Sequence, residues 1–244
     1  MLGGGCTKTG GLGAQNAMIV LTSIIRQYKQ KLMKPGSPEY IEATKTMITG
    51  SEMAAACGLN PYMSRRALWE KKVNGVIKPM NDAMKRGIED EPKAVEWFKN
   101  ATGLPVTYPV EFCRSDRYPM YGCTPDAPVG DGGLLEVKRP YSVYSDIPIY
   151  YLTQVVGQME ICHSFEGCYF LAWTPEEQRL WKAEYTESPW LWMLPYLEEM
   201  LGYIQEKKKP PRFKKKPDGR EFRELIDYEV VGTWREGKKI EERP

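Results

Sequence analysis

The sequence predicts an α/β (α+β) protein in which helices flank one mixed β-sheet. Apolar residues recur at helical spacing in the first part of the chain, and short segments rich in β-branched and aromatic residues follow, separated by Gly, Pro and Asp. The order of elements is helices, three strands, a helix, two strands and a helix, which is typical of a sheet covered by helices. With 244 residues, 42% of them hydrophobic, the chain can bury a core without disulfides or a structural metal.

The helix signal is clearest between residues 81 and 101. Met84, Ile88, Val95 and Phe98 lie roughly at helical spacing there, and Gly103 provides the stop. Further helices are expected at 18–32, at 49–58, from Ser64 onward, at 147–162 and at 188–205 with Ser188 as N-cap. Strands are expected at 106–114, 118–127, 133–138, 167–174 and 178–185.

Composition divides the chain into three parts. Residues 1–16 are rich in Gly and predict a flexible N-terminal segment, residues 17–205 predict a single domain, and residues 206–244 predict a basic, Pro-containing extension. The formal net charge is +2, but residues 205–220 hold eight Lys and Arg against two Asp and Glu. That stretch therefore carries +6 and the rest of the chain −4. Such a run of cations is either a solvated tail or a contact for phosphate backbones.

Composition also excludes several classes of protein. His163 is the single histidine, so a two-His zinc site is impossible, and we expect this residue at a helix end without a chemical role. The six cysteines form no Cys-x-x-Cys pair and are typical of reduced thiols in an intracellular protein. No apolar run reaches the ~18 residues of a spanning helix, and the N-terminus lacks a secretory pattern. We therefore expect no membrane association.

The segment GCTPDAPVGDGGLLEVKRP, residues 122–140, carries the chemistry. Glu136 and Lys138 are two residues apart in an apolar run, so on a strand they share a face while Val137 points to the core. The Asp-Gly-Gly at 131–133 can turn the chain and bring Asp126 beside them. Two carboxylates held close together repel unless a cation sits between them, and oxygen ligands favour Mg²⁺. The alternative is an exposed edge strand with an incidental salt bridge, because Glu-x-Lys recurs elsewhere in the chain.

The arrangement resembles the PD-(D/E)xK nucleases and, more narrowly, the lambda-exonuclease-like or YqaJ-type viral recombinase family of alkaline exonucleases. The resemblance covers roughly residues 46–204. It rests on four blocks in the family's order: ITGSEMAAACGLNPYMSRRALWEKK, RGIEDEPKAVEWFKNATG, TPDAPV with LLEVKRP, and YYLTQVVGQME. It implies a restriction-endonuclease-like mixed sheet flanked by helices.

The resemblance also implies a metal centre. Asp126 and Glu136 would ligate the first Mg²⁺ with the backbone carbonyl of Val137, and Glu91 would reach the same centre from its helix. Glu89 and Asp90 are rivals for the role of Glu91. Two Mg²⁺ ions about 3.5–4 Å apart, with Mn²⁺ as a substitute, would stabilise the attacking and leaving oxygens of an in-line phosphodiester displacement.

Two further roles follow from the resemblance. Lys138 would orient or deprotonate the attacking water, and nearby carboxylates favour its charged form, so we expect a positioning and charge-stabilising role. Gln154 would orient the water or Lys138, and Gln158, one turn later on the same helix face, is its rival.

The resemblance further implies a pocket for the 5′-terminal phosphate. Ser51 falls in that pocket, and Thr124 stands where the family often has Ser. The family's pocket arginine falls at Thr44, which is a departure. The replacement cation is then one of Lys45, Arg65 or Arg66.

We therefore expect a Mg²⁺-dependent exonuclease that degrades one strand of linear duplex DNA, with the 5′→3′ polarity implied by the resemblance alone. Mononucleotides would be released and single strand generated for recombination, with a single-strand annealing protein as a further partner. The oligomeric state is left open between a monomer and a ring trimer, since some relatives thread DNA through a closed ring. We expect an intracellular protein, which a viral source would place in the host cytoplasm or nucleus. The alternatives are a structure-specific endonuclease or resolvase with the same core, and a non-catalytic DNA-binding protein.

Overall fold

The computed structural model describes residues 37–77, 79–164 and 166–240. The predicted flexible segment 1–16 and the predicted helix at 18–32 lie outside the described residues. Within the described ranges, no helix is both long and apolar enough to cross a bilayer.

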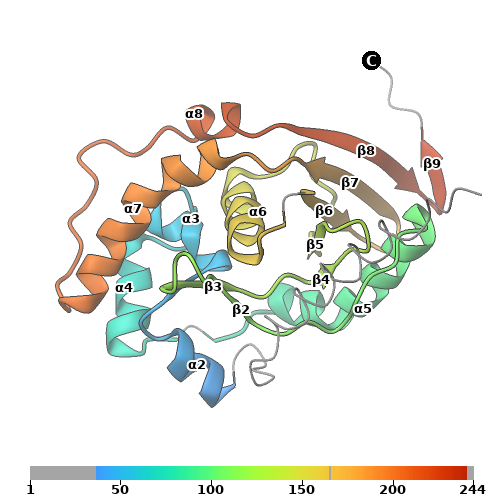
Figure 1. Ribbon diagram of the computed structural model, residues 1–244. Coiled ribbons are helices and arrows are strands. Elements are labelled where there is room, and N and C mark those ends of the chain that lie inside the picture. Colours follow the sequence, from blue (N-terminus) through green and yellow to red (C-terminus); the bar gives the residue numbers. More distant parts are fainter. Residues whose placement is uncertain (1–36, 78, 165, 241–244) are drawn as a thin grey trace, which may run out of the picture.

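A six-stranded mixed sheet forms the centre of the molecule, in the order β4-β5-β6-β7-β8-β9 (Figure 1). β5 (Leu134–Lys138) is parallel to β6 (Cys168–Trp173), and the other neighbours are antiparallel. The remaining strands are β4 (Ala127–Pro128), β7 (Glu177–Ala183), β8 (Tyr228–Arg235) and β9 (Lys238–Ile240). This mixed sheet with its flanking helices confirms the predicted fold class.

A second, three-stranded sheet lies beside the first and has the order β1-β3-β2. β1 (Ile48–Thr49) is parallel to β3 (Tyr121–Cys123), and β2 (Cys113–Arg114) is antiparallel to β3. The strands are two or three residues long, shorter than the predicted 106–114 and 118–127, because Pro and Gly interrupt those segments.

Helices cover both faces of the central sheet. α6 (Ile149–Cys162) shares the larger buried cluster with Phe170 of β6, whereas α5 (Asp82–Thr102) places Phe98 in a second cluster with Leu135 of β5. The other helices are α2 (Pro38–Thr44), η1 (Gly50–Glu52), α3 (Met53–Ala56), α4 (Arg65–Asn74), α7 (Glu187–Gln205) and α8 (Gly219–Glu224). The two clusters on opposite faces of β5 and β6 account for the near-continuous apolar character of these strands.

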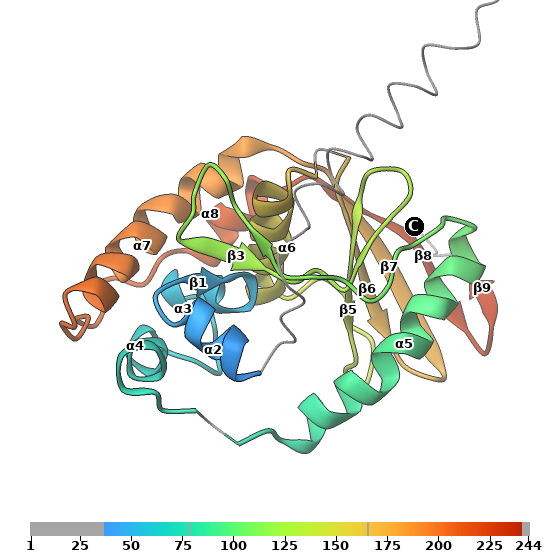
Figure 2. The ribbon, with the colours of Figure 1, turned by 60° about the horizontal axis from the view of Figure 1, so that its bottom comes forward.

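The α5 helix begins and ends close to its predicted limits, but half of its predicted apolar face is exposed. Val95 is buried with Phe98, whereas Met84 is 53% and Ile88 60% exposed. Figure 2 shows the reason, since the first turns of α5 extend away from the sheet. Spacing on a helix identifies a face, but it does not determine how far the sheet reaches along that face.

Two other predictions need correction. The N-cap of α7 is Thr186 rather than Ser188. The predicted extension 206–244 is not separate from the sheet, because β8 pairs with β7 along seven residues and Phe222 of α8 is fully buried. The β-branched and aromatic residues of β8 (YEVVGTWR) are a strand signal that the polar composition of the region obscures.

The thiols agree with the sequence-based expectation. None of the described cysteines forms a disulfide: Cys57, Cys113, Cys123, Cys162 and Cys168. His163 forms the C-cap of α6 in the left-handed conformation, with φ 53°, which confirms its predicted place at a helix end.

A buried ionic cluster joins η1 to α4. Glu52 is 2% exposed and contacts Lys72 at 2.6 Å and Lys71 at 2.7 Å, while its Oε2 accepts the backbone N–H of Thr49 at 3.0 Å. Burial alone would raise the pKa of Glu52, but Lys72 and Lys71 outweigh it and hold this pKa below its ordinary value.

Replacing Glu52 with Gln is expected to lower the free energy of unfolding by about 3–5 kcal/mol, because the buried ammonium of Lys72 loses its counter-charge. Urea denaturation measures this change. The matched control is Glu42→Gln, which removes only the exposed pair with Lys45 and is expected to change stability by less than about 1 kcal/mol.

This stabilisation should depend on pH with a defined sign. The folded-state pKa of Glu52 lies below its unfolded value, so the pairing stabilises the fold above that value and is lost as the pH falls through the folded-state pKa. The difference in the free energy of unfolding between wild type and Glu52→Gln should therefore become smaller in acid. If this difference is already small at neutral pH, the stabilising role assigned to the Glu52 ion pairs is wrong.

Candidate active site

Strand β5 directs two polar side chains to the α6 side of the sheet. Val137 lies in the α5-side cluster, while Glu136 and Lys138 project the other way and form an ion pair with each other. The strand period predicts this alternation, and the structure confirms it.

Asp126 is brought to β5 by the turn that the sequence predicts. β4 follows Asp126 directly and pairs antiparallel with β5, and the turn between them is closed by Asp131 Oδ1, which accepts the N–H of Gly133 at 2.9 Å. Asp126 Oδ2 accepts the backbone N–H of Val137 at 2.6 Å. The three polar groups predicted to converge therefore lie at one edge of β5.

Both glutamines of α6 hold Glu136, which is 1% exposed. Gln154 Nε2 donates to Glu136 Oε1 and Gln158 Nε2 donates to Glu136 Oε2, each at 2.6 Å. The sequence left the two glutamines as rivals, but a carboxylate has two oxygens and the structure uses one amide for each.

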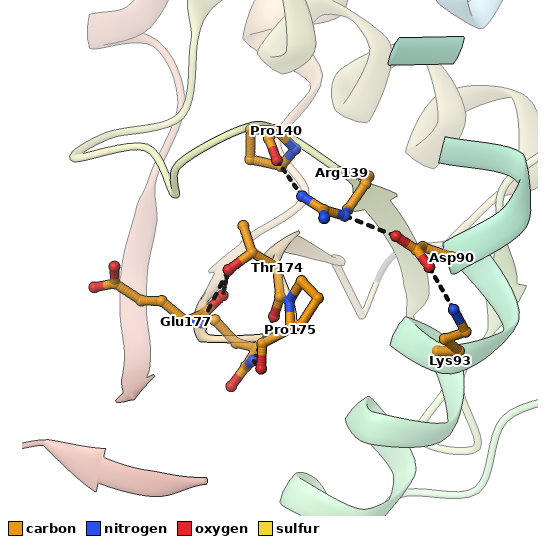
Figure 3. Close-up of polar contacts among 8 residues, drawn as sticks. Asp90, Lys93, Arg139, Pro140, Thr174, Pro175 and Glu177 are labelled. Carbon is orange, nitrogen blue, oxygen red and sulfur yellow. Dashed lines mark hydrogen bonds and ion pairs between the residues drawn. The ribbon is translucent and has the colours of Figure 1, made fainter. Parts of the chain in front are cut away.

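The structure separates Glu91 from its two rivals on α5. Asp90 is occupied by Arg139 Nε at 2.8 Å and Lys93 Nζ at 2.7 Å, as Figure 3 shows, and Glu89 is exposed. Glu91 accepts the hydroxyl of Tyr108 at 3.3 Å.

The Arg139–Asp90 ion pair also positions Glu91. Arg139 directly follows Lys138 in the chain, and Asp90 directly precedes Glu91. The ion pair, with both side chains at most 16% exposed, therefore fastens this part of α5 to the end of β5 (Figure 3).

Electrostatic coupling shows that these carboxyls share one environment. Burial and the neighbouring Glu136 raise the pKa of Asp126 well above its ordinary value, and Glu91 adds to the effect. Burial, followed by the charge of Glu136, raises the pKa of Glu91. Three carboxyls and one ammonium make a site with excess negative charge, which a cation would relieve.

Lys138 is held in its charged form. Burial alone would lower the pKa of Lys138, but the carboxylates of Glu136 and Asp126 outweigh burial and raise it above its ordinary value. The ammonium also lies over the ring of Tyr151, with Nζ 5.0 Å from the centroid. This arrangement favours a positioning cation over a general base.

The donor chemistry of the cluster fits a hard divalent cation. Asp126, Glu136 and Glu91 offer carboxylate oxygens, the ligands that Mg²⁺ prefers, and the backbone carbonyl of Val137 is adjacent. Among the described residues, however, no three acidic, Cys or His side chains are gathered as a ready-made metal site. The oxygens of Glu136 are instead taken by amide and ammonium groups, so metal binding requires Gln154 or Lys138 to release an oxygen.

Ser51 and Thr124 follow closely on the ends of two parallel strands. Thr49 and Gly122 are the last paired residues of β1 and β3, and Ser51 lies in η1 directly after β1. The residues that precede Ser51 and Thr124 are close together, because a Cβ added to Gly50 would lie 3.2 Å from the Cβ of Cys123. Ser51 is exposed, and the hydroxyl oxygen of Thr124 is buried without a hydrogen-bond partner among the described residues. An unpartnered buried hydroxyl is costly unless a ligand satisfies it.

Two of the three predicted phosphate cations, Lys45 and Arg65, pair with acidic side chains. Arg65 is buried and pairs with Glu199 at 2.7 Å, an arrangement that favours a structural role. Lys45 is exposed and lies 3.7 Å from Glu42, and Arg66 is exposed on α4.

Sequence reasoning did not single out three residues around the site: Lys71, Tyr108 and Tyr151. Lys71 is 39% exposed and contacts Glu52, the neighbour of Ser51. Tyr151 precedes Gln154 by three residues, and this spacing places it on the same face of α6. That spacing was available in the sequence, whereas the Tyr108–Glu91 contact depends on how a loop folds.

Comparisons with known proteins agree with this fold. The family model of the YqaJ-like viral recombinase domain matches residues 39–164, more than half of the chain. The chain resembles the solved alkaline exonuclease LHK-Exo from Laribacter hongkongensis, with 22% identity and a TM-score of 0.59, over 70% of this chain and 94% of that chain.

Two further solved structures share this fold. LHK-Exo in complex with dAMP matches at 21% identity and TM-score 0.59, over 70% of this chain and 94% of that one. A phage-related exonuclease from Haemophilus somnus 129PT matches at 12% identity and TM-score 0.50, over 66% of this chain and 92% of that one. No match is found among curated proteins.

The strained electrostatics of the site predict that Asp126→Asn stabilises the metal-free protein. The Asn carboxamide can still accept the N–H of Val137 but adds no charge, so the gain should be about 1 kcal/mol, or roughly 2–4 °C in Tm, in chelator at pH 8. Thermal unfolding measures it.

The sign follows from the raised pKa of Asp126, because an acid with a raised folded-state pKa destabilises the fold as the pH rises above its unfolded value. The gain should therefore shrink in acid. Asp131→Asn, at a hydrogen-bonded turn residue, should give no gain. A stability loss in Asp126→Asn would contradict the coupled cluster.

Proposed function

The chain belongs to the YqaJ-like viral recombinase family, and from this premise we propose that it is a Mg²⁺-dependent exonuclease acting 5′→3′ on linear duplex DNA. The proposal rests on one observation, the convergence of three carboxyls and one ammonium at the end of β5. The solved relatives are described as exonucleases, which supports the reaction class. The products are mononucleotides and a single strand on which an annealing protein can act.

Asp126, Glu136 and Glu91 would hold the metal, together with the carbonyl of Val137. Bound Mg²⁺, or Mn²⁺ in its place, supplies Lewis-acid stabilisation of the charge on the phosphoryl oxygens. The role of these side chains is to fix the cation relative to the strand end, and the α5 anchor at Arg139 keeps Glu91 within reach.

Lys138 and Gln154 act on the reacting groups directly. As a cation, Lys138 stabilises negative charge on the scissile phosphate and orients the attacking water. Gln154, which donates to Glu136 Oε1, would be available to orient that water if Glu136 ligated the cation, and Gln158 would keep the second oxygen of Glu136 in place.

Ser51 and Thr124 bind the 5′-terminal phosphate of the strand that is degraded. The free hydroxyl of Thr124 donates to it, and Lys71, which already contacts Glu52, supplies a cation beside Ser51. This pocket gives the enzyme a preference for phosphorylated ends and a defined polarity.

Replacing Glu91 with Gln is expected to reduce cleavage of an end-labelled linear duplex by about 10–100-fold, because the substitution removes a charge from the metal centre. Initial rates at saturating Mg²⁺ measure the loss. Glu89→Gln, on the same helix and exposed, should retain the wild-type rate. Equal losses in both variants, or none in Glu91→Gln, would refute the assignment.

Linear duplexes with 5′-phosphate and 5′-hydroxyl ends test the terminal pocket. Wild type should degrade the phosphorylated duplex at least about 10-fold faster, and Thr124→Val should reduce that ratio while sparing the rate on 5′-hydroxyl ends. Thr107→Val, at an exposed position, is the control. A closed-circular duplex should resist cleavage, and its rapid cleavage would point instead to an endonuclease.

A further inference from the structure

Residues 207–216 form a segment, here called the basic strap, that the proposed catalytic site does not use. Seven of its ten residues are Lys or Arg and none is acidic, and all seven of these cations are exposed. The strap lies beyond residues 39–164, which match the family model. In Figure 1 it is the loop that leaves the end of α7 and returns to α8, at the opposite end of the molecule from β9.

The strap is packed onto the protein rather than free. Phe213 lies under the guanidinium of Arg65, with the Cζ of Arg65 4.6 Å from the ring centroid, and Arg65 is itself fixed by Glu199. The Phe213 ring also fills the space beside Gly58, where an added Cβ would lie 2.4 Å from a ring carbon. Pro210 is buried. A solvated tail would show none of these anchors.

Most cations of the strap lie outside ion pairs, and the charge of Asp218, just beyond the strap, interacts with Lys215. In the ranges that the structure describes, Lys209 alone among them forms an ion pair, with Glu70 at 3.2 Å. Holding the other six in an anchored segment costs repulsion that a bound polyanion would offset. The rest of the chain is net negative, so this concentration of positive charge is a local feature of the strap.

We infer that the basic strap binds the phosphate backbone of duplex DNA, outside the pocket that holds the scissile phosphate. This inference rests on the proposed function for the choice of polyanion. Phe213, the one aromatic side chain of the strap, packs against Arg65 and so is not available for insertion into a bilayer. Lys and Arg contacts to phosphates are sequence-independent and weaken with salt, so the strap holds the duplex without selecting its sequence.

The test measures binding of a fluorescent duplex in EDTA, where no cleavage occurs. Replacing Lys214, Lys215 and Lys216 with Gln should weaken binding at least about 10-fold at ~0.1 M salt and reduce the slope of log K against log[salt] by about 2–3. The control replaces Arg235, Lys238 and Lys239, at the β8–β9 end of the molecule, with Gln. It should change neither the affinity for the duplex nor the salt slope.

Phe213→Ala separates an anchored strap from a tail, because it keeps every charge. It should lower the affinity for the duplex several-fold and leave the salt slope unchanged. An unchanged affinity would show that binding does not depend on anchoring of the strap by Phe213. Equal losses of duplex affinity in the Lys214–Lys216 variant and the control would overturn the DNA assignment. Binding of the same variants to vesicles containing phosphatidylglycerol is measured in parallel, and a loss of vesicle binding without a loss of duplex binding would overturn it too. Because binding is read without metal, a catalytically silent wild type that still binds through the strap would refute the proposed function alone.

Discussion

The rest of the candidate site depends on one buried carboxylate, that of Glu136. A charge this deep is tolerated only with hydrogen-bond partners, and Gln154, Gln158 and Lys138 supply them. Two of the three partners come from α6, so the position of α6 against β5 is set by a polar requirement as well as by apolar packing. The same carboxylate raises the pKa of Asp126 and of Glu91. Asp126 and Glu91 therefore lie where a cation would relieve their repulsion with Glu136. In the absence of a cation, the oxygens of Glu136 accept hydrogen bonds from Gln154, Gln158 and Lys138.

Topology brings the candidate site together from distant parts of the chain. The parallel pairing of β1 with β3 brings η1, which holds Ser51, to the end of β3, and the chain continues from there through Thr124 to Asp126, directly before β4. α6 approaches the η1–α3 turn closely because residue 157 is Gly, where a Cβ would lie 2.1 Å from the Sδ of Met53. The proposed terminal-phosphate pocket and the carboxylate cluster thus lie against the same helix, α6.

Local patterns in the sequence predicted the centre of the site well and its surroundings poorly. The strand period placed Glu136 and Lys138 on one face, and the Asp-Gly-Gly turn predicted the approach of Asp126, because both depend on neighbours in the chain. The structural role of Arg65 could not be predicted, since its partners are 134 residues or more away. The integration of β8 into the sheet was hidden for a similar reason, because pairing with β7 is a long-range event.

The central claim is that the carboxylate and ammonium groups at the end of β5 hydrolyse phosphodiesters. Release of labelled mononucleotides from a linear duplex with Mg²⁺, compared between wild type and the folded variants Glu136→Gln and Lys138→Ala, tests it most directly. The account predicts steady release by wild type and a loss of more than about 100-fold in both variants. Wild-type rates in either variant, or a wild-type protein that is silent on every form of DNA with Mg²⁺ and Mn²⁺, would contradict it.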